Sequence, residues 1–132
     1  MTKFFHARRG GFTLLEIMIV VAIIAILASI ALPAFLRARK RSQATLVLED
    51  LRILDHALEQ YAADQNISSD TEVDFSQLQV YVKKGTKLHQ TGTDVYGNAY
   101  GPFYVNQHPS VPSDTYVALA DVVDAEFWEP YD

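Results

Sequence analysis

The chain has 132 residues, a formal net charge of −5 and no cysteine. This length allows one small domain beside a membrane segment, and the missing cysteines exclude a disulfide framework and thiolate metal sites. Beyond Lys87 there are seven acidic residues and no Lys or Arg, which argues against nucleic acid as a partner because phosphate binding needs cations.

The N-terminal segment is basic and leads into a long apolar run. Residues 1–11 carry three cations and no acid, and the 20 residues from Ile17 to Leu36 carry no charge. At about 1.5 Å of rise per residue, a helix of this length crosses the roughly 30 Å hydrocarbon layer of a bilayer. A secretory signal has an apolar centre of only about 7–15 residues, followed by its cleavage site. We therefore expect this helix to remain in the mature protein.

One carboxylate lies inside the apolar block. Glu16 follows Phe12, Leu14 and Leu15 and comes immediately before the charge-free run. A carboxylate at the centre of a membrane helix costs roughly 2.5–3.5 kcal/mol on insertion scales, and such residues are candidates for function. We expect another chain to compensate this charge.

The segment 11–16, Gly-Phe-Thr-Leu-Leu-Glu, resembles the processing site of the type IV pilins and the type II secretion pseudopilins. The resemblance implies that a membrane peptidase cuts between Gly11 and Phe12 and that the new Phe12 amine is methylated. It also implies that Glu16 pairs with the N-terminal amine of a neighbouring subunit during assembly. Pro33 matches the proline in the middle of the family's N-terminal helix.

The resemblance divides the chain into three parts. Residues 1–11 are a prepilin leader that is cleaved, residues 12–36 are a transmembrane and filament-core helix, and residues 37–132 are a periplasmic globular domain. The N-terminus is expected in the cytoplasm, where the leader meets the peptidase, although the basic residues Arg37–Arg41 make the charge count slightly favour the opposite orientation. The implied partners are further copies of this chain, the prepilin peptidase, an assembly ATPase with a platform protein, and the inner membrane.

Pro33 has two interpretations. It lacks a backbone donor and crowds the carbonyl four residues earlier, which predicts a kink or weak point around residues 29–33. Such a kink is tolerated in membrane helices. The alternative is a segment that loosens when subunits pack against each other.

From Arg37 the same helix is expected to continue to about Gln65. No Gly or Pro occurs between Leu36 and Asn66, and apolar residues recur at spacings of three and four, which mark one face of an α-helix. The residues of this face are Ala44, Val47, Leu51, Leu54, Leu58 and Tyr61.

The remaining segments predict a short helix and a small sheet. Residues 75–82 follow a capping signal, whereas residues 103–105 and 115–119 are rich in β-formers and predict an antiparallel hairpin. A third strand is expected near residues 86–89, and a last helical turn within residues 120–128. The fold class is therefore α+β: a long N-terminal helix packed on a small antiparallel sheet with turn-rich C-terminal loops. By resemblance this is the pilin fold.

Residues 94–102 form a turn-rich loop in which Gly97, Asn98 and Gly101 can take positive φ. The loop resembles one in the major pseudopilins of type II secretion, although Tyr96 stands where Trp is usual and Ala99 where Pro is usual. The other interpretation is a tight turn whose tyrosines close the core.

Calcium is the one metal that the resemblance raises. Major pseudopilins bind it in their C-terminal loops through acidic side chains and carbonyls, which suit a hard cation. The candidate ligands here are Asp94, Asp121 and Asp124, although the Gly-rich acidic tail of those proteins is absent. The four histidines show no metal spacing, and no nucleophile or phosphate-loop motif occurs. We expect no catalytic residue, no other cofactor and no enzyme.

The sequence thus predicts a structural subunit of a type IV pilus-like filament. The first hypothesis is a major pseudopilin of a type II secretion system. The second is a type IV pilin of a surface pilus that serves adhesion, motility or DNA uptake, and a minor or tip subunit is a third. A different class is a single-span anchored periplasmic binding module, in which Glu16 would be dispensable.

Overall fold

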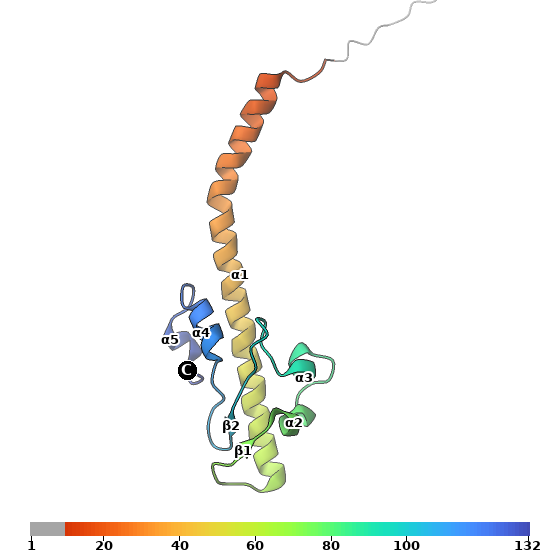
Figure 1. Cartoon of the computed structure of the whole chain (residues 1–132), viewed down its shortest axis with the longest axis vertical. Coiled ribbons are helices and arrows are strands. Elements are labelled where there is room, and N and C mark those ends of the chain that lie inside the picture. The colour runs from red at the N-terminus through yellow and green to blue at the C-terminus, as the bar shows by residue number, and fades with distance from the viewer. Residues whose placement is uncertain (1–9) are drawn as a thin grey trace, which may run out of the picture. The chain divides into compact units, whose positions relative to one another are not determined.

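The structure is a computed structural model and describes residues 10–132. The chain falls into two compact units, one that ends at Leu36 and one from Arg37 to Asp132. Helix α1 (Leu14–Gln65) contributes its first part to one unit and its second part to the other (Figure 1). Each unit is described by itself below.

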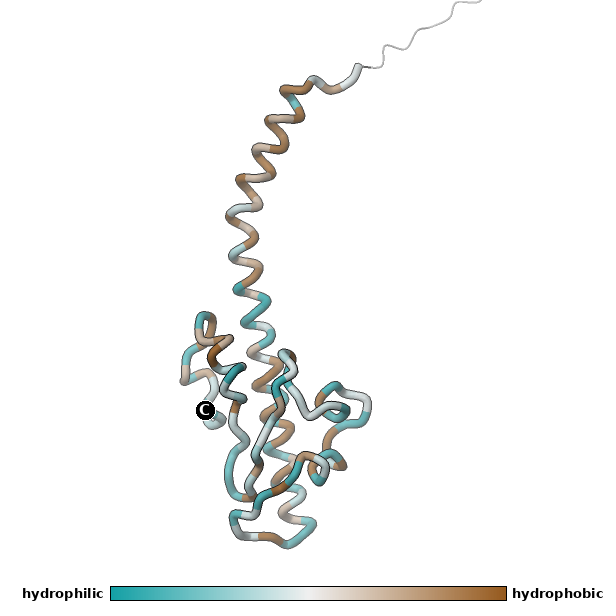
Figure 2. The backbone as a smooth tube through the Cα atoms, viewed as in Figure 1, coloured by the Kyte–Doolittle hydropathy of each residue, from teal (hydrophilic) through white to brown (hydrophobic). Residues whose placement is uncertain are grey.

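Helix α1 confirms the predicted long helix. It has 52 residues and continues through Pro33. Its first part is apolar all round, whereas its second part alternates between apolar and polar residues (Figure 2). One stretch of α1 is long and apolar enough to cross a membrane, and none of that stretch is buried within the protein. The helix ends at Gln65, and Asn66, with a positive φ of 53°, begins the turn that the sequence predicted.

The second unit packs short elements against the second part of α1. In the described residues its sheet has two antiparallel strands, with Glu72 opposite Tyr104 and Val73 opposite Phe103. The predicted helix over residues 75–82 is present as α2 followed by the 3-10 helix η1. The elements after α1 are β1 (Glu72–Val73), α2 (Phe75–Leu78), η1 (Gln79–Tyr81), α3 (Lys87–Thr91), β2 (Phe103–Tyr104), α4 (Ser113–Leu119) and α5 (Ala125–Trp128). The α+β architecture is confirmed.

Two predicted strands are wrong. Residues 115–119 lie in helix α4 and pair with no strand, because Pro112 stands at the helix start and Asp114 lies in the first turn, a position that favours proline and acids. Residues 86–89 enter helix α3, where the Thr86 side chain accepts a hydrogen bond from the His89 amide. The side-chain cap of Thr86 in α3, and the proline and the acid at the start of α4, therefore favour helices over the predicted strands.

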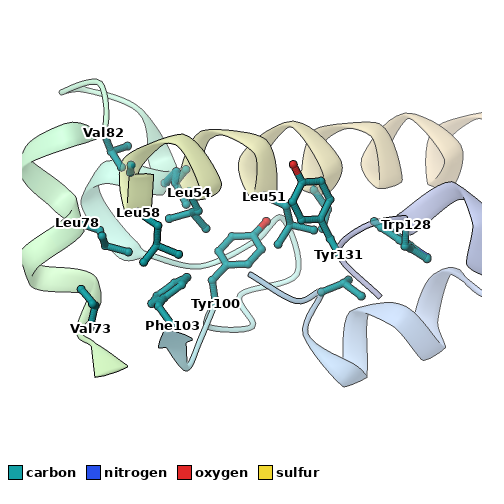
Figure 3. Packing of buried hydrophobic residues seen from close by; sticks show 14 of the residues in the cluster. Leu51, Leu54, Leu58, Val73, Leu78, Val82, Tyr100, Phe103, Trp128 and Tyr131 are labelled. Carbon is teal, nitrogen blue, oxygen red and sulfur yellow. The ribbon is translucent and has the colours of Figure 1, made fainter. Parts of the chain in front are cut away.

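The core of the second unit lies along one face of α1, as predicted. Residues from β1, α2, β2 and the C-terminal segment pack against this face (Figure 3). Trp128 is 1 % exposed and Tyr131 is also buried, so both close the core, while Phe127 is only partly buried. The buried residues of α1 are Ala44, Val47, Leu51, Leu54, Ala57 and Leu58.

Candidate assembly site at the start of helix α1

Glu16 takes part in a reciprocal cap with Thr13. Its Oε2 atom accepts hydrogen bonds from the Thr13 amide at 2.7 Å and from the Thr13 hydroxyl at 3.1 Å. In return, the Glu16 amide donates to the Thr13 hydroxyl oxygen at 3.2 Å. This is the capping box of a helix N-terminus, in which two otherwise unpaired backbone donors are satisfied.

The cap lies among apolar side chains that the protein does not cover. Phe12 is 86 % exposed, and Leu14, Leu15 and Ile17 are exposed as well. Exposed apolar surface of this extent marks contact with a membrane or with another protein. Within the described residues all three hydrogen bonds of the cap involve Thr13, and the Oε1 atom of Glu16 accepts none. The carboxylate therefore keeps capacity for a donor from outside the chain.

The predicted cleavage point lies just outside the helix. Gly11 and Phe12 are exposed and precede Leu14, where α1 begins. A peptide bond in a non-helical, exposed segment can enter a peptidase site without unfolding a helix. Cleavage and methylation at Gly11 and Phe12 remain predictions, and residues 1–9 of the leader lie outside the described residues.

Pro33 lies inside α1. Because proline has no backbone N–H, the carbonyl of Ser29 loses its usual helical donor. The Ser29 hydroxyl donates to the carbonyl of Ile26 at 2.7 Å and so adds no partner for its own carbonyl. The predicted weak point around residues 29–33 has a physical basis here, and its role in assembly remains a prediction.

Asp94 is a fully buried carboxylate that holds its own loop together. Its Oδ1 accepts from the amides of Tyr96 at 2.8 Å and Asn98 at 2.9 Å. Its Oδ2 accepts from the hydroxyl of Thr115 on α4, and that hydroxyl oxygen accepts from the Asn98 side chain at 2.8 Å. Gly97 and Gly101 have positive φ of 89° and 119°, as predicted, whereas Asn98 does not. Asp94 and Asn98 therefore tie the loop to Thr115 of α4.

Asp121 and Asp124 are engaged elsewhere. Asp121 pairs with Lys40 at 2.8 Å, and this hydrogen bond lowers the pKa of the Asp121 carboxyl. Asp124 accepts from the Phe127 amide at 3.1 Å as the N-cap of α5. In the part of the chain that is described, no three acidic or histidine side chains gather as metal ligands do. The donor set proposed for calcium, which includes Asp94, does not fit one ion.

Thr13 is the site residue that the sequence reasoning missed. The signal was present, because Thr13-Leu14-Leu15-Glu16 matches the pattern Ser/Thr-x-x-Glu of a capping box before an apolar run. Glu16 was treated only as an intermolecular partner, and its local partner three residues earlier was overlooked.

The N-terminal segment of the chain matches a known protein family. Residues 6–32 match the family described as the prokaryotic N-terminal methylation motif. The chain carries a prepilin-type N-terminus. The resemblance to type IV pilins and type II secretion pseudopilins is thereby confirmed.

The similar proteins include a type IV pilin and core proteins of type II secretion systems. The prepilin-type chain is 42 % identical over 66 residues to the type IV major pilin protein PilA of Myxococcus xanthus, covering 50 % of this chain and 30 % of that protein. It is 37 % identical over 65 residues to the type II secretion system core protein G of Aeromonas hydrophila, covering 49 % and 46 %. In these two matches the chain spans less than half of the relative's length.

A third relative aligns along most of its length. Core protein G of Pseudomonas aeruginosa is 29 % identical over 126 residues, which cover 86 % of this chain and 85 % of that protein. No solved structure matches the chain significantly. The apolar helix and the prepilin-type motif fit a subunit anchored in the inner membrane.

Proposed function

We propose that this chain is a structural subunit of a type IV pilus-like filament, and specifically a major pseudopilin of a type II secretion system. The observation that carries the proposal is the Glu16 carboxylate at the start of a helix whose apolar side chains are exposed from Leu14 to Leu36. An ordinary membrane anchor needs no carboxylate there, whereas an assembling subunit can use it to select its partner.

The first step of the proposed mechanism is processing. Prepilin peptidase removes residues 1–11 on the cytoplasmic side, and the new N-terminus at Phe12 carries a methylated amine. This cut removes three cations and supplies a cation of another kind, an ammonium group two residues before the helix. The globular unit from Arg37 onward lies in the periplasm in this arrangement.

The second step is the exchange of partners at Glu16. Before assembly, Thr13 satisfies the carboxylate within the chain. During assembly the Phe12 ammonium of a neighbouring subunit approaches the carboxylate and forms a charge-assisted hydrogen bond, which is about twice as strong as a neutral one. A membrane interior strengthens this attraction because its dielectric constant is low. Subunits with the wrong register leave Glu16 unpaired and are disfavoured.

The third step is packing of the apolar helices in the filament core. Each subunit presents its α1 to the next in the same way, so the contact is heterologous and growth is open-ended. The subunit acts by assembly and not by catalysis. An ATPase and a platform protein supply the work of moving each helix out of the bilayer.

The choice of pseudopilin rests on how far the relatives align. The match to core protein G of Pseudomonas aeruginosa extends through the globular unit, whereas the match to the Myxococcus xanthus pilin covers half of this chain. The second candidate is a type IV pilin of a surface pilus. It is favoured by the identity to the Myxococcus xanthus pilin, which at 42 % exceeds the 29 % identity to the Pseudomonas aeruginosa protein.

The test replaces Glu16 by leucine in the full chain, in cells that contain the assembly machinery. We expect filaments to disappear from the sheared fraction while the Glu16→Leu protein accumulates in the membrane. Met18→Leu changes an exposed side chain of the same apolar segment without removing a charge and serves as the control, which should still assemble. Normal filaments from the Glu16→Leu variant would contradict the proposed pairing between Glu16 and the Phe12 amine.

Intact mass of the membrane protein tests the processing step separately. We expect a chain that starts at methylated Phe12. A chain that still starts at Met1 in the presence of active prepilin peptidase would contradict the filament proposal.

A further inference from the structure

The second part of α1 is not fully covered by the elements packed around it. A groove of about 380 Å³ runs between α1 and the segment that holds α3. Two apolar side chains of α1 line it and remain accessible, Leu46 at 48 % and Ile53 at 37 % exposure. Buried apolar residues, among them Val82 and Leu88, form its floor. The groove is therefore an apolar surface without a partner in the monomer.

Charged side chains mark both sides of the groove, with Glu49 and Asp50 on α1 and Lys83 and Lys87 on the α3 side. Lys87 lines it and donates to the carbonyl of Asp94 at 2.5 Å. Lys83 also lines it, is exposed, and makes no ion pair or side-chain hydrogen bond within residues 10–132. Since Lys87 already has a partner, Lys83 is the cation on the α3 side that remains free for an incoming acid.

Helix α4 presents the complementary pattern. Val117 is 74 % exposed, and Asp114 precedes it by three residues, so both side chains lie on the same face of the helix. Ala118 beside them is exposed as well. We define the α4 face as Asp114, Val117 and Ala118. On this face the apolar side chain of Val117 protrudes next to the carboxylate of Asp114.

We propose that the α4 face of one copy docks into the α1–α3 groove of the next copy in the filament. Val117 covers Leu46 and Ile53, and Asp114 lies opposite Lys83. This inference rests on the proposed function and names the contact between neighbouring globular units. It commits to a second copy as the occupant because the groove and the face that fits it belong to the same chain.

The geometry of the two surfaces favours an open-ended contact. In Figure 1, α3 and α4 lie on opposite sides of the second part of α1. A contact between two different faces leaves one groove and one α4 face free at the ends of every assembly, which permits growth without closure. A closed dimer would instead require the same patch on both copies.

The charge distribution of the chain supports the same direction of docking. Every charged residue beyond Lys87 is acidic, whereas Lys83, Lys84 and Lys87 form a basic group on the α3 side. Complementary charges steer partners together and fix their register, while like charges that face each other reject the wrong pairing. Asp114 of the α4 face is therefore attracted to Lys83 and repelled by Glu49 and Asp50, which line the α1 side of the same groove.

The test uses cysteine pairs, because the natural chain has no cysteine and each new thiol is unique. Filaments of the full-length Ile53→Cys/Val117→Cys variant are treated with a short bis-maleimide and separated under denaturing conditions. We expect a ladder of dimers, trimers and longer species, since each copy contributes both thiols to different contacts. Ser68→Cys/Val117→Cys, with Ser68 exposed and outside the groove, is the matched control and should give no ladder.

The outcomes separate this inference from the proposed function. Filaments of the Ile53→Cys/Val117→Cys variant that give no ladder, or no more ladder than the control pair, overturn the docking contact and leave the filament standing. If the parent chain forms no filaments with its machinery present, the proposed function itself fails.

If the paired cysteines prevent assembly, charge-reversal variants of Lys83 and Asp114 test the docking contact instead. Lys83→Glu and Asp114→Lys should each lower the filament yield several-fold, because each turns an attraction into a repulsion at every contact along the polymer. The double variant should restore the yield, and Lys84→Glu, at a lysine outside the groove lining, should change it little. A double variant that assembles no better than the single variants overturns the docking contact.

Discussion

Replacement of Thr115 by valine tests whether the loop of Asp94 is held by protein groups. Valine has nearly the shape of threonine but lacks the hydroxyl. The substitution removes the donor to Asp94 Oδ2 and the acceptor of the Asn98 amide in a fully buried position. It therefore leaves one carboxylate oxygen and one amide group without these partners.

The expected loss can be estimated from the contacts. A hydrogen bond to a charged group contributes about 1.5–3 kcal/mol, and a buried acceptor left unsatisfied adds to the loss. We expect Thr115→Val to lower the free energy of unfolding by about 2–3 kcal/mol. For a domain of this size, that corresponds to a fall of roughly 10–20 °C in Tm.

The assay is thermal unfolding of the full chain in detergent micelles, followed by the fluorescence of Trp128, the single tryptophan. Trp128 is buried in the same unit and reports its unfolding. Thr45→Val is the matched control, because Thr45 is exposed on α1 and bonds only to the Arg41 carbonyl in the described residues. Its effect should stay within about 0.5 kcal/mol.

Two results would refute the reasoning. If the Tm of the Thr115→Val variant equals that of the Thr45→Val variant, the buried hydroxyl does not hold the loop. A calcium chelator is expected to leave the natural chain unchanged, because Asp94 is satisfied by the amides of Tyr96 and Asn98 and by Thr115. A chelator that destabilised the natural chain would show that a cation, and not these groups, closes the loop.

Two further predictions concern the same unit. Burial raises the pKa of the Asp50 carboxyl, whose Oδ2 accepts from Tyr100 at 3.1 Å. The folded state therefore holds this proton more tightly than the unfolded chain, and the ionised carboxylate reduces stability at neutral pH. Asp50→Asn keeps an acceptor for Tyr100 and should raise Tm at pH 7, with the gain gone below about pH 4; an equal gain at both pH values would contradict this origin. Gly92→Ala should lower Tm, because φ is 62° and the new Cβ would lie 2.7 Å from the Phe75 ring. The matched control is Gly85→Ala, which also has a positive φ but has no neighbour within 4 Å of a Cβ; an equal loss in both would show that the contact with Phe75 contributes nothing.

The long helix and its site could be read from the sequence because their signals are local. The charge-free run, the 3–4 spacing of the apolar residues and the absence of Gly and Pro from Leu36 to Asn66 predicted α1 to within two residues at its start and to its end at Gln65. Glu16 stood out by its charge alone. Even Thr13, which was missed, is only three residues from its partner.

The globular unit was harder because its decisive contacts join distant residues. Asp94 and Thr115 are 21 residues apart, and no spacing rule connects them. The side chains of residues 115–119 suggested a strand by composition, yet Pro112 and Asp114 began a helix there. Short elements follow their caps and tertiary contacts more than their propensities. The sheet predicted from propensity was therefore too large, while the α+β class was right.

The exposed apolar part of α1 also has a consequence for the lifetime of the proposed filament. Lipid tails are as apolar as leucine, so exchange of the helix between the bilayer and its own polymer is nearly neutral in hydrophobic free energy. Transfer into water is different, because each buried CH₂ group contributes about 0.8 kcal/mol. The apolar part of α1 is therefore stable in the bilayer or packed in the polymer, but not when exposed to water. A filament in aqueous surroundings should shed no subunits sideways and should shorten only from the end that rests on the membrane.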